Sequence, residues 1–217
     1  MKTIILIMVL FMFAAPAFGR PGVLAWEDAV QKTMDVPNKQ GQLSTMTFIS
    51  GNKAYMTIYD AISYQDKYFW NDIAVLENQT EIKNIDVMVN SYGGSSFVAF
   101  ALVDMINRAE KDGFKFKAYG TGVIASAAIP IFLSFNERVA SPGTLFMVHE
   151  GSSRLSGTTS QFQAHNVMIE LLQDRYFDIL ILETKVKDRT KWKEWERDTE
   201  WFDAETAQER GLIQGIE

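Results

Sequence analysis

The chain has no cysteine among its 217 residues and only two histidines, His149 and His165. The absence of cysteine excludes disulfides, thiolate catalysis and zinc sites with cysteine ligands. Two histidines cannot form a histidine-rich metal site, and the carboxylates show no spacing of the EF-hand kind. We therefore expect a protein that works without a metal or another cofactor.

An excess of positive charge is also missing. The formal net charge is −6, and no basic stripe is present that could neutralise the phosphates of a nucleic acid. We therefore expect no nucleic-acid partner. The chain is 47% hydrophobic and 22% charged, a balance typical of one domain that buries a sizeable core.

The N-terminus carries the long apolar run of the chain. Lys2 precedes the apolar residues 3–15, and the small-residue stretch AAPAFG leads to Arg20. The run is shorter than the ~20 residues that a membrane-spanning helix needs, and the order of charged, apolar and small residues is typical of a secretory signal peptide. We expect residues 1–19 to be removed, which would give a periplasmic or secreted protein with no stable membrane insertion. An uncleaved anchor is the alternative.

The rest of the chain divides into a polar N-terminal arm, residues 20–45, and a domain over residues 46–217. In this domain strand-like apolar runs alternate with segments of helical spacing. The alternation predicts an α/β fold with a largely parallel sheet. The expected strands are residues 45–50, 54–60, 84–91, 114–120 and 144–150, and the expected helices are residues 70–82, 97–111, 124–135 and 158–184. The charge-rich segment 183–200 is expected to be a solvated helix and its exit.

Three of the expected strands end in segments that suit catalysis. In parallel α/β sheets, ligand-binding and catalytic groups gather at the carboxyl ends of the strands. The segment NSYGGSS, residues 90–96, contains a glycine pair whose backbone N–H groups can face an oxyanion. Ser126, in GTGVIASAAIPIF, lies among small residues where a helix begins, and His149 ends the apolar strand LFMVHEG.

Each of these features alone has an ordinary structural explanation: a strand–helix turn, a serine N-cap and a buried histidine. Together they supply the oxyanion donors, the nucleophile and the base of a hydrolase. The G-x-S-x-G elbow of the α/β-hydrolases is absent, which disfavours that family. His165 lies inside an expected helix, so we expect it to be structural.

Four ordered segments resemble those of the Clp protease proteolytic subunit family, which has a crotonase-like fold. VMVNSYGGSS is similar to that family's strand and glycine turn, and YGTGVIASAA is similar to its nucleophile segment. PGTLFMVHEGSS is similar to its histidine strand, and WFDAETAQERGLIQGI to its closing signature. The resemblance covers roughly residues 50–217 and is nearest to the divergent phage and prophage-type members.

The resemblance implies a ClpP/crotonase-like spiral of ββα units with a long protruding handle helix, here residues 158–184. It implies a serine endopeptidase for peptides or unfolded proteins, with Ser126 as the nucleophile and His149 as the general base. By the same resemblance, Gly94 and Ala127 would donate the N–H groups of the oxyanion hole. Assembly into homo-oligomeric rings is also implied.

The third member of the catalytic triad departs from the family's pattern. Matching without gaps from Ala204 puts Thr199 at the position of the acid, between Asp198 and Glu200. We choose Asp198 as the acid, with Glu200 as the next candidate. Asp203 is expected to cap the last helix.

Further departures leave other interpretations open. Tyr92 replaces a proline of the family's glycine turn, and Pro130 lies inside the helix expected after Ser126. Glu150 and Gly151 replace the polar-Pro pair that usually follows the histidine. These changes fit a catalytically inactive assembly subunit. A signal-peptide-peptidase-like protease with a Ser–Lys dyad also fits export, and an acyl-CoA enzyme of the crotonase type is a further alternative. An exported member would have no ATP, so we expect no ATP-driven unfoldase partner.

Overall fold

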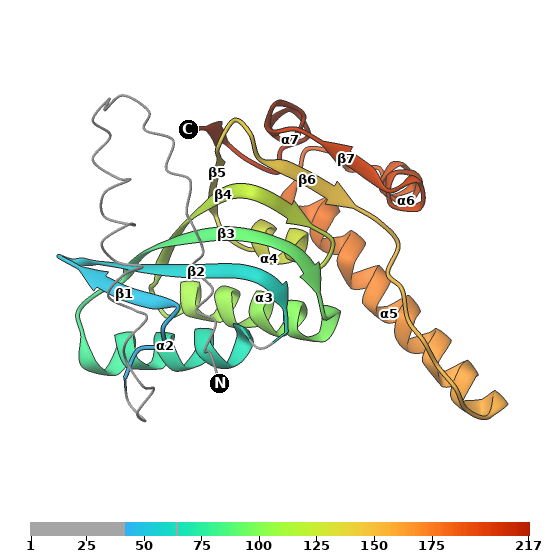
Figure 1. Cartoon of the computed structure of the whole chain (residues 1–217), viewed down its shortest axis with the longest axis horizontal. Helices are drawn as coiled ribbons and strands as arrows, with labels where there is room; N and C mark the ends of the chain where they lie inside the picture. The colour runs from blue at the N-terminus through green and yellow to red at the C-terminus, as the bar shows by residue number, and fades with distance from the viewer. Residues whose placement is uncertain (1–41, 64) are drawn as a thin grey trace, which may run out of the picture.

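The computed structural model describes residues 42–63 and 65–217, which form a sheet with helices packed on it (Figure 1). The strands are β1 Thr47–Ser50, β2 Lys53–Ile62, β3 Asn84–Gly94, β4 Lys115–Ala125, β5 Glu137–Ala140, β6 Leu145–Val148, β7 Glu200–Phe202 and β8 Gly215–Ile216. The helices are α2 Gln65–Gln79, α3 Ser96–Lys111, α4 Ala128–Leu133, α5 Thr159–Glu183, α6 Arg189–Asp198 and α7 Ala204–Arg210.

The predicted signal peptide and nearly all of the predicted N-terminal arm lie outside the described residues, so both stay predictions. Among the helices that the structure describes, none has the length and apolar character to cross a membrane.

The sheet is largely parallel, as the alternation of strands and helices predicted. The strand order is β1-β2-β3-β4-β5-β8, and β6 and β7 branch off from β4. Within the described sheet, the antiparallel pairs are β1 with β2 and β6 with β7. Helices α2 and α3 lie against each other along one face of the sheet (Figure 1). The expected α/β architecture is therefore confirmed.

Strand β4 changes its neighbour part-way along its length. Its residues Lys117–Gly120 pair with β5, and its residues Val123–Ala125 pair with β6. Gly122 lies between the two parts with φ 62°, a left-handed conformation that glycine adopts readily. The side-chain oxygen of Asn90 accepts a hydrogen bond from the N–H of Val123 at 3.2 Å, which holds the bend. The bend brings β6 beside the carboxyl end of β4.

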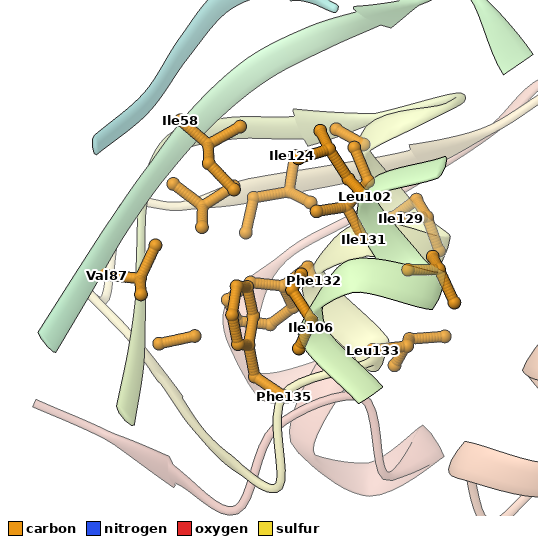
Figure 2. Packing of buried hydrophobic residues seen from close by; sticks show 14 of the residues in the cluster. Ile58, Val87, Leu102, Ile106, Ile124, Ile129, Ile131, Phe132, Leu133 and Phe135 are labelled. Atoms are coloured by element: carbon orange, nitrogen blue, oxygen red, sulfur yellow. The ribbon is translucent and has the colours of Figure 1, made fainter. Parts of the chain in front are cut away.

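An apolar core fills the space between the sheet and the helices (Figure 2). Every residue of α4 is buried, and Ile129 and Phe132 of α4 lie in the same cluster as Leu102 of α3. Pro130 is the third residue of α4, where a backbone N–H would have no partner inside the helix. Pro130 therefore removes no helical hydrogen bond, and the segment that follows Ser126 is anchored in the core.

Asp203 caps α7 as predicted, but α2 starts earlier than expected. Thr158 caps α5 in a capping box with Gln161. Helix α2 begins at Gln65 rather than at Trp70. The first residues of α2 are polar, so the spacing of apolar residues could not predict its first turn.

Helix α5 extends away from the sheet over its N-terminal half (Figure 1). Of its residues, Phe177 and Leu180 are buried within the described chain. Phe162, Val167 and Leu171 are exposed by 44%, 55% and 66% of their surface, which leaves apolar side chains open to solvent in the single chain. The expected long protruding helix is confirmed.

Candidate active site

Ser126 and His149 meet at the carboxyl edge of the sheet. Nε2 of His149 lies 2.9 Å from Oγ of Ser126, within hydrogen-bond distance. The two residues directly follow β4 and β6, which are parallel neighbours and end side by side. The N–H of Ser126 also donates to the carbonyl oxygen of Met147 at 2.9 Å. The sheet therefore holds the nucleophile candidate and the base candidate in one rigid frame.

Ser126 makes a sharp turn between strand and helix. Its φ is 56°, a left-handed conformation that is strained for a residue other than glycine. Its carbonyl oxygen accepts a hydrogen bond from the N–H of Ile129 at 3.0 Å, which ties the turn to the buried helix α4. Strain of this kind persists only where the surroundings enforce it, and it is frequent at active sites.

Gly93 allows the glycine turn to approach this serine. Its φ is 92°, and a Cβ atom placed on it would lie 2.7 Å from both the carbonyl oxygen of Ala125 and Cβ of Ser126. Such a Cβ would also lie 2.8 Å from the nitrogen of Ala127. The N–H of Gly93 donates to Oγ of Ser91 at 3.1 Å. The first glycine of the pair therefore serves close packing, a role that the sequence analysis did not assign.

The two predicted oxyanion donors are Ala127, which directly follows Ser126, and Gly94, the second glycine of the glycine pair. The N–H of Ala127 donates no hydrogen bond within the described part of the chain, and Ala127 lines the cavity next to Ser126. A free N–H beside a nucleophile suits a developing oxyanion. Gly94 has φ 151° and packs against the backbone of Ile62. The oxyanion roles of Gly94 and Ala127 stay predictions.

The backbone of the candidate acids lies close to the residues around His149, but their side chains bond to groups other than His149. The N–H of Glu150 donates to the carbonyl oxygen of Glu196 at 3.1 Å, so the end of α6 runs alongside the residues after β6. Across residues 42–63 and 65–217, no hydrogen bond joins His149 to Asp198, Thr199 or Glu200.

Two arginines hold the carboxylates of these candidates. Arg197 donates to Asp198 at 2.9 Å and keeps the pKa of that carboxyl below its usual value. Arg210 donates to Glu200 at 2.8 Å. Thr199 is the left-handed C-cap of α6. The assignment of the acid to Asp198 stays a prediction.

A cavity of about 340 Å³ opens beside Ser126 and His149. Helices α3, α5 and α6 contribute its walls, and its side chains are both apolar and polar. The lining from these helices comprises Ser96, Phe100, Ile169, Leu172, Gln173, Tyr176 and Glu196. The described residues contain no group of three or more His, Asp or Glu side chains that could hold a metal ion.

Glu196 is a cavity residue that the sequence analysis missed. The segment 183–200 was expected to be a solvated helix, and α6 is indeed a helix. Trp192 and Glu196, however, are only 0% and 5% exposed. Their spacing of four residues places them on one face of a helix, so the buried tryptophan was the signal that could have revealed Glu196.

Comparison with known proteins decides the family. A family model described as Clp protease matches residues 51–217, which is more than half of the chain. The chain belongs to the Clp protease family. Membership of the Clp protease family confirms the resemblance and the fold that it implied, and it supports a peptidase function.

The curated relatives share this family at low identity. The ATP-dependent Clp protease proteolytic subunit 2 of Treponema denticola is 26% identical over 146 residues, which cover 66% of this chain and 71% of that protein. The protein of the same name from Borreliella burgdorferi is 28% identical over 149 residues, which cover 68% of this chain and 73% of that protein. The one from Thermobifida fusca is 24% identical over 147 residues, 67% of this chain and 70% of that protein.

We predict that Gly93→Ala destabilises the protein more than Gly113→Ala. The two glycines have φ of 92° and 93°, so both substitutions carry a similar backbone strain of about 1–2 kcal/mol. A Cβ on Gly113 meets nothing within 4 Å, whereas a Cβ on Gly93 collides with the backbone around Ser126. We expect the collision to add about 1–3 kcal/mol. Free energies of unfolding from urea titration measure both effects, and equal losses for the two variants would contradict the packing role of Gly93.

Proposed function

We propose that the chain is a serine endopeptidase that cleaves peptides or unfolded proteins. The observation that carries this proposal is the 2.9 Å approach of Nε2 of His149 to Oγ of Ser126. A serine hydroxyl becomes a useful nucleophile only when a base can take its proton. Membership of the Clp protease family supports the same assignment.

The reaction that fits this pair is acyl transfer in two steps. Oγ of Ser126 attacks the peptide carbonyl carbon while Nε2 of His149 takes the hydroxyl proton. The N–H groups of Ala127 and Gly94 are proposed to stabilise the negative oxygen that forms. The C–N bond then breaks, and His149 returns the proton to the leaving amine. Water, deprotonated by His149, releases the acyl group and restores the serine.

Asp198 is our proposed acid, and this role requires its side chain to move. In the described conformation the Asp198 carboxylate is exposed and paired with Arg197. A solvent-exposed ion pair of this kind adds little stability, so it presents only a small barrier to reorientation towards His149. If the carboxylate stays with Arg197, the site works as a Ser–His pair or is inactive.

We also propose that the protein is exported and acts in the periplasm or outside the cell. The apolar N-terminal segment ending before Arg20 supports export. The relatives named above are called ATP-dependent, but an exported enzyme has no ATP supply, so we propose that this one works without an ATP-driven unfoldase. The exposed apolar residues of α5 support assembly into a homo-oligomeric ring.

The Ser–Lys dyad is the second candidate mechanism, because it is also compatible with export. Among the described residues, no lysine forms a hydrogen bond with Ser126 or lines the cavity, whereas His149 does both. The two mechanisms differ in whether His149 is needed, so replacing His149 distinguishes them.

We predict that a fluorophosphonate probe labels the wild-type protein at Ser126. Ser126→Ala should abolish labelling, and His149→Ala should slow it by about 10²- to 10⁴-fold because the base is lost. His165→Ala is the matched control, because His165 also pairs with a serine, Ser153, at 2.9 Å but lies outside the cavity. In-gel fluorescence over time measures the rates.

Each other outcome of this labelling experiment has a definite meaning. Unchanged labelling of His149→Ala would overturn the Ser–His mechanism and favour a dyad with a lysine. No labelling of the assembled wild type would indicate an inactive assembly subunit.

We predict that Asp198→Asn lowers the labelling rate at least about tenfold, because the imidazole loses its orienting carboxylate. Arg197→Ala is the control, since it removes the ion-pair partner and leaves the carboxylate in place. It should keep or raise the rate. A rate in Asp198→Asn equal to that of wild type would remove Asp198 from the triad, and Glu200→Gln would then be tested in the same way.

We predict that protein recovered from the periplasm or medium begins at Arg20 and forms particles several times the mass of one chain. The mass of the intact protein, measured by mass spectrometry, identifies its N-terminal residue, and light scattering measures the mass of the particle. An intact Met1 in the membrane fraction would indicate an uncleaved anchor. A purely monomeric protein would contradict the ring.

A further inference from the structure

Glu196 places a buried carboxylate in the wall of the cavity beside Ser126. The residue is 5% exposed, and its Oε2 accepts a hydrogen bond from Nε2 of Gln173 at 3.0 Å. Within the described part of the chain, Glu196 has no second side-chain partner and forms no ion pair. A carboxylate withdrawn from water in this way is costly unless a donor or a cation meets it.

The surroundings of Glu196 do not neutralise its charge. Burial raises the pKa of the Glu196 carboxyl, the hydrogen bond from Gln173 lowers it, and the charge of Glu150 raises it again. The charge of Lys193, on the exposed side of α6, also lowers the pKa of Glu196, but its Nζ lies over the ring of Phe177 at 5.8 Å. The cavity therefore has two acidic side chains, Glu150 at its rim and Glu196 in its wall, without a matching cation.

Apolar side chains from α3 and α5 line part of the cavity. Phe100, Ile169 and Leu172 line it together with the ring of Tyr176. The hydroxyl oxygen of Tyr176 is buried and has no hydrogen-bond partner within residues 42–63 and 65–217. The negative charge of Glu196 adds to burial in raising the pKa of this hydroxyl, so the two polar groups lie near each other. A buried carboxylate next to apolar side chains of α3 and α5 suits a ligand side chain with an apolar stem and a polar tip.

We propose that this cavity binds the substrate side chain whose carbonyl Ser126 attacks, and that Glu196 selects lysine or arginine at that position. The stem of such a side chain is apolar and suits the walls from α3 and α5, and its cationic tip would meet the carboxylate. Because the same cavity is lined by Ser126 and His149, the bound residue lies next to the reacting bond. This inference rests on the proposed function and names its substrate class.

Paired fluorogenic peptides that differ only in the charged tip test the proposal. Ala-Ala-Lys and Ala-Ala-norleucine coumarin amides share the same stem length, so their ratio of kcat/KM reports the cation alone. We expect wild type to favour lysine at least about tenfold. Glu196→Gln keeps the size and a hydrogen-bonding amide, and it should remove or reverse the preference. Glu194→Gln is the matched control, because Glu194 is exposed on the same helix and lies outside the cavity.

Equal rates, or faster cleavage of norleucine by wild type, would overturn the proposal without the need for any variant. A lysine preference that persists in Glu196→Gln would overturn the role of Glu196.

A binding measurement separates this proposal from the proposed function. The Ser126→Ala protein and dye-labelled Ala-Ala-Lys-Ala-Ala or its norleucine counterpart are compared by fluorescence anisotropy. Tighter binding of the lysine peptide, in a protein whose wild type resists fluorophosphonate, would support the cavity assignment and reject the peptidase. Fluorophosphonate labelling without any lysine preference in cleavage or binding would support the peptidase and reject the cavity assignment.

Discussion

The pairing of β6 with the last residues of β4 is the constraint on which the rest of the site depends. Before Gly122, β4 pairs with β5, and after it β4 pairs with β6. The bend at Gly122 leaves both strands ending at one edge, so Ser126 and His149 emerge side by side. Without the change of neighbour, the histidine strand would have no place beside the serine strand.

The turn at Ser126 and the glycine pair is strained, and burial of the neighbouring helix α4 offsets this strain. Ser126 and Gly93 both have φ in the left-handed region, and their backbones are in close contact. Helix α4 follows at once and is buried along its whole length. Burial of its apolar side chains supplies a stabilisation that keeps the strained turn in place. A loop exposed to solvent could not hold a serine in this conformation so firmly.

The carboxylates around the site have different environments, and these suggest different roles. Asp198 and Glu200 each have an arginine within hydrogen-bond distance, so their charges are compensated. Glu196 has no cation paired with it in the described structure, although it is the most buried of the three. A compensated carboxylate can rest in this conformation without a ligand. The uncompensated one gains most from a positively charged substrate side chain.

Local patterns in the sequence predicted much of this protein. The alternation of apolar runs predicted the parallel sheet, and the segments around Ser126, His149 and the glycine pair were correctly placed at strand ends. These features depend on neighbouring residues, which is why short patterns carry them. The capping residues Thr158 and Asp203 were predictable for the same reason, because a cap bonds to its own helix.

Tertiary structure alone decided which side chains line the cavity and which carboxylates are neutralised. Asp198, Thr199 and Glu200 are adjacent in sequence, yet their directions depend on the left-handed cap at the end of α6 and on the positions of Arg197 and Arg210. Glu196 lines the cavity because Trp192, one turn earlier, is buried and turns that face of the charged helix inward. The sequence by itself determined the order of the longer strands and helices and the residue types at their ends, but not the short strands β5, β7 and β8. The packing of α6 against the body of the protein determined the electrostatics of the site, because burial and long-range pairing do not follow from neighbouring residues.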